Sequence, residues 1–243
     1  MAESKIQNFN HLKIHSQFSI CEGAIKIDDL KEVAKEKKIK SLGLCDTSNL
    51  CGALEFAEKI SKSGTQPIIG TQINFKFGDT IGLIPLFALS EVGYKRIIEL
   101  SSLSYLSNDG TTEPHLNSEE LIKRNDGVSV FSGTINGLIG QLFNKGKFSD
   151  IEELYSKLKS AYGDKFYIEI QRHGDQNEIS FEKFNLSLSS KLEIPIIATN
   201  EVFYSNKDMY EAHDALICIK NKTYINEKNR IKYSNQHYLK NNS

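Results

Sequence analysis

The sequence predicts an α/β fold built on parallel strands, and it favours a closed barrel over an open sheet. Short β-branched runs alternate with helical patterns about six or seven times, which is typical of strand–helix units. The motifs GxGxxG and GxxxxGK[ST] are absent, so an open nucleotide-binding sheet has no support. A length of 243 residues suits a single α/β barrel.

The composition is that of an ordinary soluble protein. Hydrophobic residues make up 39% and charged residues 25%, which argues against disorder, collagen and a disulfide scaffold. A net charge of −1 lacks the basic footprint of proteins that wrap nucleic acid, although a local basic patch stays open. The longest apolar run, 81–89, contains Gly82 and Pro85, and the N-terminus lacks the apolar core of a signal peptide. We therefore expect a cytoplasmic protein with no membrane contact.

The four cysteines form no C-x-x-C pair, so we expect reduced, structural thiols. Cys45 and Cys51 are predicted to lie in the core.

The first half of the chain alternates predicted strands with amphipathic helices. In 28–38, Leu30, Val33 and Ala34 share one helical face. A turn at Gly78-Asp79 separates two strands. The expected elements are strand 10–15, helix 28–38, strand 41–45, helix 49–61, strands 66–75 and 80–89, and helix 90–103.

The second half continues the alternation after a loop at 108–114. Ser149 and Glu152 suggest a capping box at the start of a helix that ends at residue 162. Phe181 and Phe184 share a helical face and are assigned to the core. The expected elements are helix 118–124, strand 127–132, helix 149–162, strand 166–170, helix 178–192, strand 194–199, helix 207–220 and an irregular tail, 221–243.

Polar side chains able to do chemistry follow most of the predicted strands. In a strand–helix barrel these strand ends lie on one face, where active sites are built. The pattern predicts a polar crevice that holds His15, Asp46, His173 and Glu201, which are residue types that bind divalent metals or act as acids and bases. The competing interpretation is that polar residues follow strands only because loops begin there.

Several segments together resemble the PHP (polymerase and histidinol phosphatase) domain family, and more narrowly the N-terminal domain of bacterial DNA polymerase III alpha subunits. The resemblance covers roughly residues 9 to 240, and TSNLCG and IIATNEV are specific to the polymerase branch. The matching segments, in family order, are HLKIHSQFSICEGA, LCDTSNLCGALEFAEK, QPIIGTQINF, GLIPLFALSEVGYKRIIELSSLSYL, GVSVFSGTINGLIG, FYIEIQRHG, IPIIATNEVFY and AHDALICIKNKT.

The resemblance implies a distorted (βα)7 barrel that, in active members, binds up to three metal ions and hydrolyses phosphoesters. Here the ligand pattern is degenerate, which implies that the metal cluster is lost. The departures are Lys13 for the first His of H-x-H, Thr47 for a His, Gln72 for a Glu, Thr134 for a Cys, and Glu201-Val202-Phe203 for Asp-x-His. The weak remaining metal candidates are His15, Asp46, His173 and Glu201.

The resemblance also implies a role. The parent protein would be a DNA-directed DNA polymerase, a nucleotidyltransferase of DNA replication, whose Mg²⁺ lies in a polymerase domain absent here. The domain itself would be catalytically vestigial and need no cofactor. Its partners would be the rest of the alpha chain, the epsilon proofreading exonuclease and other replicase subunits, with DNA contact unproven. The expected division is an extension at 1–9, the barrel at 10–220 and a tail at 221–243 that leads towards the polymerase domains.

The rival function is an active metal-dependent phosphoesterase or 3′–5′ exonuclease that uses Zn or Mn. Two further interpretations stay open, which are a pure interaction module and a generic barrel with a false family match. An apolar surface patch would favour the interaction module, and the absence of a strand–helix barrel would show the false match.

Single residues also have competing interpretations. His15 is either a hydrogen-bonded structural residue or a ligand, and Asp46 is either a ligand or the cap of the following helix. Lys13 is predicted to pair with Asp46 or Glu201 and so replace the lost metal charge. His11 is expected to be structural. No role is assigned to the remaining histidines, which are His115, His213 and His237.

Overall fold

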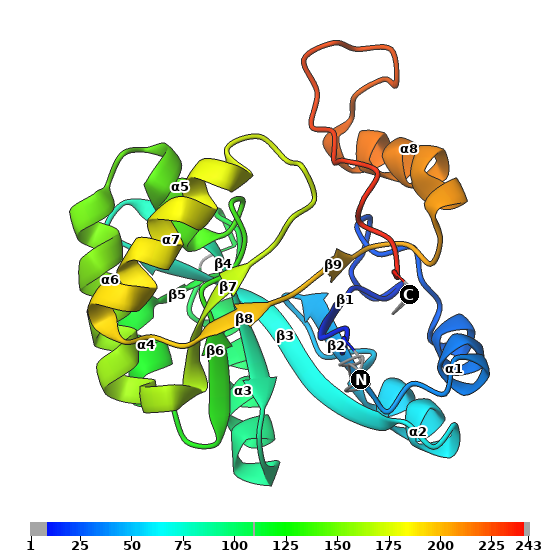
Figure 1. The fold of residues 1–243 in the computed structure, drawn as a ribbon, viewed down its shortest axis with the longest axis horizontal. Coiled ribbons are helices and arrows are strands. Elements are labelled where there is room, and N and C mark those ends of the chain that lie inside the picture. Colours follow the sequence, from blue (N-terminus) through cyan, green and yellow to red (C-terminus); the bar gives the residue numbers. More distant parts are fainter. Residues whose placement is uncertain (1–8, 109, 241–243) are drawn as a thin grey trace, which may run out of the picture.

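The computed structural model describes residues 9–108 and 110–240 and shows a mostly parallel, curled half-barrel sheet with helices packed around it (Figure 1). The expected segment 1–9 lies outside the described residues except for Phe9. The strands are β1 (Lys13–Ile14), β2 (Ser41–Thr47), β3 (Gln66–Phe77), β4 (Thr80–Ala88), β5 (Leu116–Asn117), β6 (Val128–Phe131), β7 (Phe166–Ile170), β8 (Ile196–Ala198) and β9 (Glu201–Val202). The helices are α1 (Ile27–Glu36), α2 (Ala53–Lys62), α3 (Glu91–Leu106), α4 (Ser118–Lys123), α5 (Leu138–Asn144), α6 (Phe148–Tyr162), α7 (Glu178–Leu192) and α8 (Tyr210–Asn221).

The strand order along the large sheet is β2-β3-β4-β6-β7-β8, with β5 added beside β3. The predicted barrel-type α/β fold is confirmed, but β4 is antiparallel to both β3 and β6, whereas all strands were expected to be parallel. The reason lies in the turn: Phe77 pairs with Thr80, so only Gly78 and Asp79 connect the strands. A two-residue connection can join only antiparallel neighbours, and Gly78 takes the positive φ (59°) that such a turn requires.

Two short strands form a separate two-stranded sheet beside the edge strand β2. β1 pairs in parallel with β9, with Lys13 opposite Glu201, and the Gly43 N–H of β2 donates to the His11 carbonyl at 2.7 Å. A Cβ on Gly43 would lie 2.3 Å from the Leu12 carbonyl oxygen, so this close approach needs glycine. The consequence is that residues near the two ends of the chain lie side by side next to β2.

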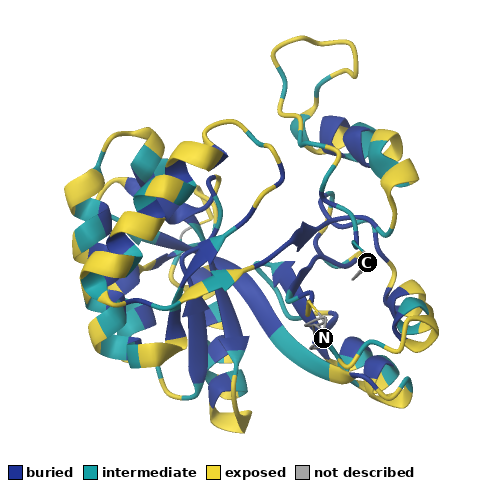
Figure 2. Ribbon diagram, viewed as in Figure 1, coloured by how far each residue is buried: buried dark blue, intermediate teal, exposed yellow. Residues whose placement is uncertain are grey.

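The helices turn their buried residues towards the sheet, and their outer faces are exposed (Figure 2). One core lies under α3–α7 and includes Phe181, with Phe184 packed against it, as predicted. A second core lies under α1 and α2 and includes Ile14, Leu30 and Phe56. A third and smaller cluster, formed by Cys45, Phe87 and Phe131, lies on the opposite face of the sheet, because Cys45 and Phe87 both pair with Gly70.

Several local predictions are wrong. Helix α5 was not predicted, and α6 begins after Lys147 with no side-chain cap, so the capping box is absent. α2 begins at Ala53 rather than at 49, which leaves Cys51 exposed while Cys45 is buried. The segment after α8 is irregular as predicted, yet it packs back on the barrel, where Leu239 is buried and Tyr238 bridges to Tyr204.

No helix in the described part of the chain is long and apolar enough to cross a membrane.

Candidate functional site

The predicted site residues lie on or just after the strands β1, β2, β3, β6, β7 and β9, and all of them except Thr134 are buried. Gln72, Thr134 and Glu201, from three separate elements, line one small cavity together with Phe203 and Glu22. The cavity has a volume of about 40 Å³, which is room for little more than water. The structure therefore brings the family positions together but leaves only a small space among them.

Lys13 is the centre of the crevice. Its side chain is fully buried, with Nζ 3.1 Å from Glu201 Oε1 and 3.5 Å from Glu169 Oε1. Within the described residues this ammonium has no hydrogen bond of good geometry, so the two ion pairs are what compensates its burial. The predicted partner Glu201 is therefore found, whereas Asp46 is not within ion-pair distance of Lys13 and Glu169 is the second partner.

The charges in this cluster stabilise one another. Burial alone would raise the pKa of Glu201, but the charge of Lys13 and the hydrogen bond with His15 outweigh it and hold that pKa well below its usual range. For Lys13, burial alone would lower the pKa, and the two carboxylates more than reverse that effect. Lys13 and Glu201 are both ionised at neutral pH.

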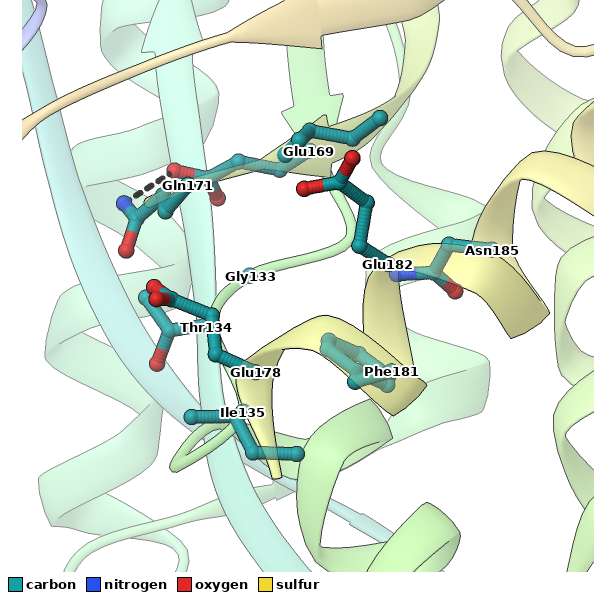
Figure 3. Close-up of a pocket in the computed structure, with 10 residues that line it drawn as sticks. Gly133, Thr134, Ile135, Glu169, Gln171, Glu178, Phe181, Glu182 and Asn185 are labelled. Carbon is teal, nitrogen blue, oxygen red and sulfur yellow. Dashed lines mark hydrogen bonds between the residues drawn. The ribbon is translucent and has the colours of Figure 1, made fainter. Parts of the chain in front are cut away.

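Glu169 is a residue that sequence reasoning missed. It lies inside β7, in the run FYIEI, and its Oε1 accepts hydrogen bonds from Gln171 Nε2 (2.8 Å) and from the Thr199 hydroxyl. Its other oxygen, Oε2, has no partner in the described chain, and it faces a small cavity lined also by Asn185 (Figure 3). A carboxylate inside a buried apolar strand requires a partner. The single glutamate in the run FYIEI was therefore the sequence signal that could have indicated a buried ion pair.

His15 has partners on both ring nitrogens. Nε2 lies 3.3 Å from Glu201 Oε1, and Ser19 Oγ lies 3.4 Å from Nδ1. The ring also packs against Phe203, the residue at the last family ligand position, at a centroid distance of 4.7 Å. These contacts favour the structural interpretation of His15.

Asp46 is held by hydrogen-bond donors. Oδ1 accepts from the Ser16 N–H and from Ser19 Oγ, both at 2.7 Å, and Oδ2 accepts from Ser16 Oγ at 2.8 Å. The prediction that Asp46 caps the next helix is wrong, because α2 begins after Gly52, which has no side-chain cap. Asp46 instead ties the segment after β1 to the end of β2.

The remaining family positions form a polar chain at the rim of the crevice. Gln72 Nε2 donates to Thr47 Oγ1 at 2.9 Å, and Thr47 Oγ1 donates to Glu22 Oε2 at 2.6 Å. Glu22 in turn pairs with Lys220 of α8 at 2.6 Å. Gln72, Thr47, Glu22 and Lys220 are thus linked in one chain of polar contacts.

This donor set does not fit the metal cluster that the resemblance implies. A metal ion at Glu201 would meet the Lys13 ammonium, 3.1 Å from the same oxygen, and like charges at that distance repel strongly in a buried site. Gln72, Thr47 and Thr134 offer only neutral oxygens where thiolate, imidazole or carboxylate ligands are expected.

His173 adjoins the Lys13 cluster, since the Glu201 N–H donates to its Nε2 at 3.3 Å, and it also belongs to a second group of side chains. Its Nε2 is 3.1 Å from Asn200 Oδ1, its Nδ1 is 3.4 Å from Glu178 Oε1, and its ring stacks on His237 with centroids 4.0 Å apart. His237, which had no assigned role, is 3.3 Å from Asp175. No sequence pattern indicates this pairing, because 62 residues separate Asp175 from His237.

The chain resembles known proteins over its whole length. A family model described as PHP domain matches residues 11–173. The DNA polymerase III subunit alpha of Caulobacter vibrioides is 33% identical over 248 residues, which cover 99% of this chain and 22% of that protein. The protein of the same name from Rickettsia prowazekii is 37% identical over 212 residues, which cover 87% of this chain and 18% of that protein. This chain therefore spans about a fifth of the length of these curated relatives.

A solved structure supports the fold. An amidohydrolase from Chromobacterium violaceum superposes with a TM-score of 0.52 at 11% identity, covering 85% of this chain and 96% of that chain. At this identity the likeness concerns the arrangement of strands and helices and nothing finer.

Proposed function

The chain belongs to the PHP domain family, and from that premise we propose that it is the PHP part of a DNA polymerase III alpha chain whose ancestral metal centre is replaced by Lys13. The observation that carries the proposal is the buried ammonium between Glu201 and Glu169. A lysine there supplies the positive charge that the carboxylates need, but it cannot activate water as a metal ion does.

The domain then acts as a structural platform within a replicative polymerase. Nucleotide transfer, with its Mg²⁺ ions, would take place in other parts of the full alpha chain. The similarity to alpha subunits extends over nearly all of this chain, which supports a role shared with the matching region of those proteins. We assign to this platform the docking of the epsilon exonuclease and contact with other replicase subunits.

The catalytic half of the proposal is tested by metal content and phosphoesterase activity. We expect no phosphoesterase activity. We also expect that the His15→Gln variant binds as much Zn or Mn as the parent chain, because no metal is held at His15. Elemental mass spectrometry after dialysis measures the metal, and hydrolysis of a chromogenic phosphoester measures the activity. Two or more equivalents of metal that fall in His15→Gln, together with hydrolysis, would establish an active phosphoesterase instead.

The docking half is tested separately by mixing the chain with the epsilon exonuclease subunit of the same organism. Co-elution of the two on size exclusion is expected. Separate elution at micromolar concentrations would remove the docking role and leave the structural role alone.

A further inference from the structure

His173, Asp175 and His237 form a group of metal-ligating side chains outside the Lys13 cluster. One ligand atom from each lies within 4.8 Å of the others, and both histidines are buried while Asp175 is partly exposed. His173 and Asp175 lie in the loop between β7 and α7. His237 comes from the C-terminal segment, which the bridge between Tyr204 and Tyr238 holds against the barrel. The group therefore links two distant parts of the chain.

The contacts of His237 call for a cation at Asp175. His237 Nδ1 lies 3.1 Å from the Glu201 carbonyl oxygen, so this nitrogen must carry a proton and donate it. In a neutral ring, Nε2 then holds a lone pair, which would face Asp175 Oδ2 at 3.3 Å, acceptor against acceptor. Either a second proton or a metal ion resolves this contact.

The geometry suits a metal ion of the zinc class. Zinc ligands at about 2.0–2.1 Å in a tetrahedron lie roughly 3.3–3.4 Å from one another, and the separation of His237 Nε2 from Asp175 Oδ2 is 3.3 Å. A ligating histidine commonly donates its other ring N–H to a backbone carbonyl, as His237 does to Glu201.

His173 completes the set of protein ligands. Its ring is now parallel to that of His237, at 9° between planes, so it must rotate out of the stack to direct a nitrogen at the same ion. On rotation Nδ1 gives up its contact to Glu178, and Nε2 gives up two contacts, to Asn200 and to the Glu201 N–H, which donates to it at 3.3 Å. Glu178 stays in place because the backbone N–H groups of His173 and Gly174 donate to it.

We propose that His173, Asp175 and His237 bind one divalent ion of the zinc class, which fastens the C-terminal segment to the β7–α7 loop. The three ligands leave a fourth position for water. The ion would hold in place the segment that follows the barrel. This site uses none of the side chains around Lys13, and its existence does not depend on the proposed function.

The test is binding of Zn²⁺ to the chain, with Co²⁺ as a spectroscopic probe. We expect one equivalent of Zn²⁺ in titration calorimetry, a rise in melting temperature that a chelator reverses, and visible Co²⁺ bands typical of tetrahedral coordination. The conservative variants His237→Gln and Asp175→Asn should each weaken Zn²⁺ binding at least about 100-fold, because even residues that only support a metal ligand are worth roughly 10- to 100-fold. The exposed His115, changed to Gln, serves as the matched control and should bind as the parent chain does.

Two results would overturn the proposal. One is the absence of stoichiometric binding and of a Co²⁺ spectrum in the parent chain, which would leave a proton on His237 as the occupant. The other is unchanged binding in folded His237→Gln and Asp175→Asn. If zinc binding were lost in His15→Gln but kept in His237→Gln, the ion would lie near Lys13, which would overturn this site and count against the proposed function. Failure of this site alone and failure of the proposed function therefore give different results.

Discussion

Glu201 and Asp46 are two buried carboxylates in one crevice, and the protein balances them in different ways. Glu201 lies against the Lys13 ammonium and His15. Asp46 lies beyond ion-pair distance of any lysine or arginine in the described residues and accepts three hydrogen bonds from two serines. A buried carboxylate can therefore be balanced either by a fixed charge or by a set of neutral donors.

The two solutions should differ in how much one substitution costs. Removing an ammonium leaves charge uncompensated in a dry site, whereas removing one hydroxyl leaves a carboxylate with other donors still in place. Substitutions at the two kinds of site therefore distinguish the solutions, and the largest effect is expected at the fixed charge.

The Lys13→Met variant should lose about 3–5 kcal/mol of unfolding free energy, because Glu201 and Glu169 would remain buried without a counter-charge. Urea denaturation measures this loss. Adding Glu201→Gln to Lys13→Met should recover part of it, since one of the orphaned charges is then removed. A loss below about 1 kcal/mol would mean that water or a metal ion reaches the carboxylates, and the charge-replacement explanation would fail.

His11 represents a third solution, a buried group kept neutral. Burial lowers its pKa from 6.5 to about 4. As pH falls below 6.5 the unfolded chain takes up the proton first, so stability should decline by about 3 kcal/mol between pH 6.5 and 4. The His11→Gln variant should lack this decline. Denaturant curves at several pH values check it, and parallel pH profiles for the two chains would contradict the prediction.

Glu201 adds a separate decline at lower pH. Its folded pKa lies well below 4.5, so its stabilisation is complete above the unfolded value and is lost as pH falls through the folded one. His11 and Glu201 thus lower the stability of the fold in two different pH ranges, with His11 acting at the higher pH.

The Ser19→Ala variant tests the hydrogen-bonded carboxylate. It removes one donor to Asp46 Oδ1 and the acceptor of the Thr47 N–H, and it should cost about 1–3 kcal/mol. Thermal or urea unfolding measures the loss. A cost equal to that of Lys13→Met would erase the distinction between charge and neutral donors.

The sequence predicted the alternation of strands and helices because those signals are local, and the polar strand ends followed from it. The pairing of Lys13 with Glu201 was also within reach, since both occupy family ligand positions. Glu169 was missed because its strand resembles any apolar run with one polar residue. His237 was missed for another reason: only the long-range pairing of the C-terminal segment with Phe203 and Tyr204, just after β9, brings it to His173.

The smallest expected effect comes from a second lysine-to-methionine substitution, made at an exposed ion pair. Lys95 pairs with Glu91 at 2.6 Å on the surface of α3, with both side chains largely in solvent. The Lys95→Met variant should change the unfolding free energy by less than about 0.5 kcal/mol, because water screens both partners and solvates the one left behind. Urea denaturation beside Lys13→Met makes the comparison direct. If both variants lost several kcal/mol, lysine-to-methionine exchange itself would be harmful and burial would not be the cause. A large loss at Lys13 alone assigns the cost to the buried carboxylates.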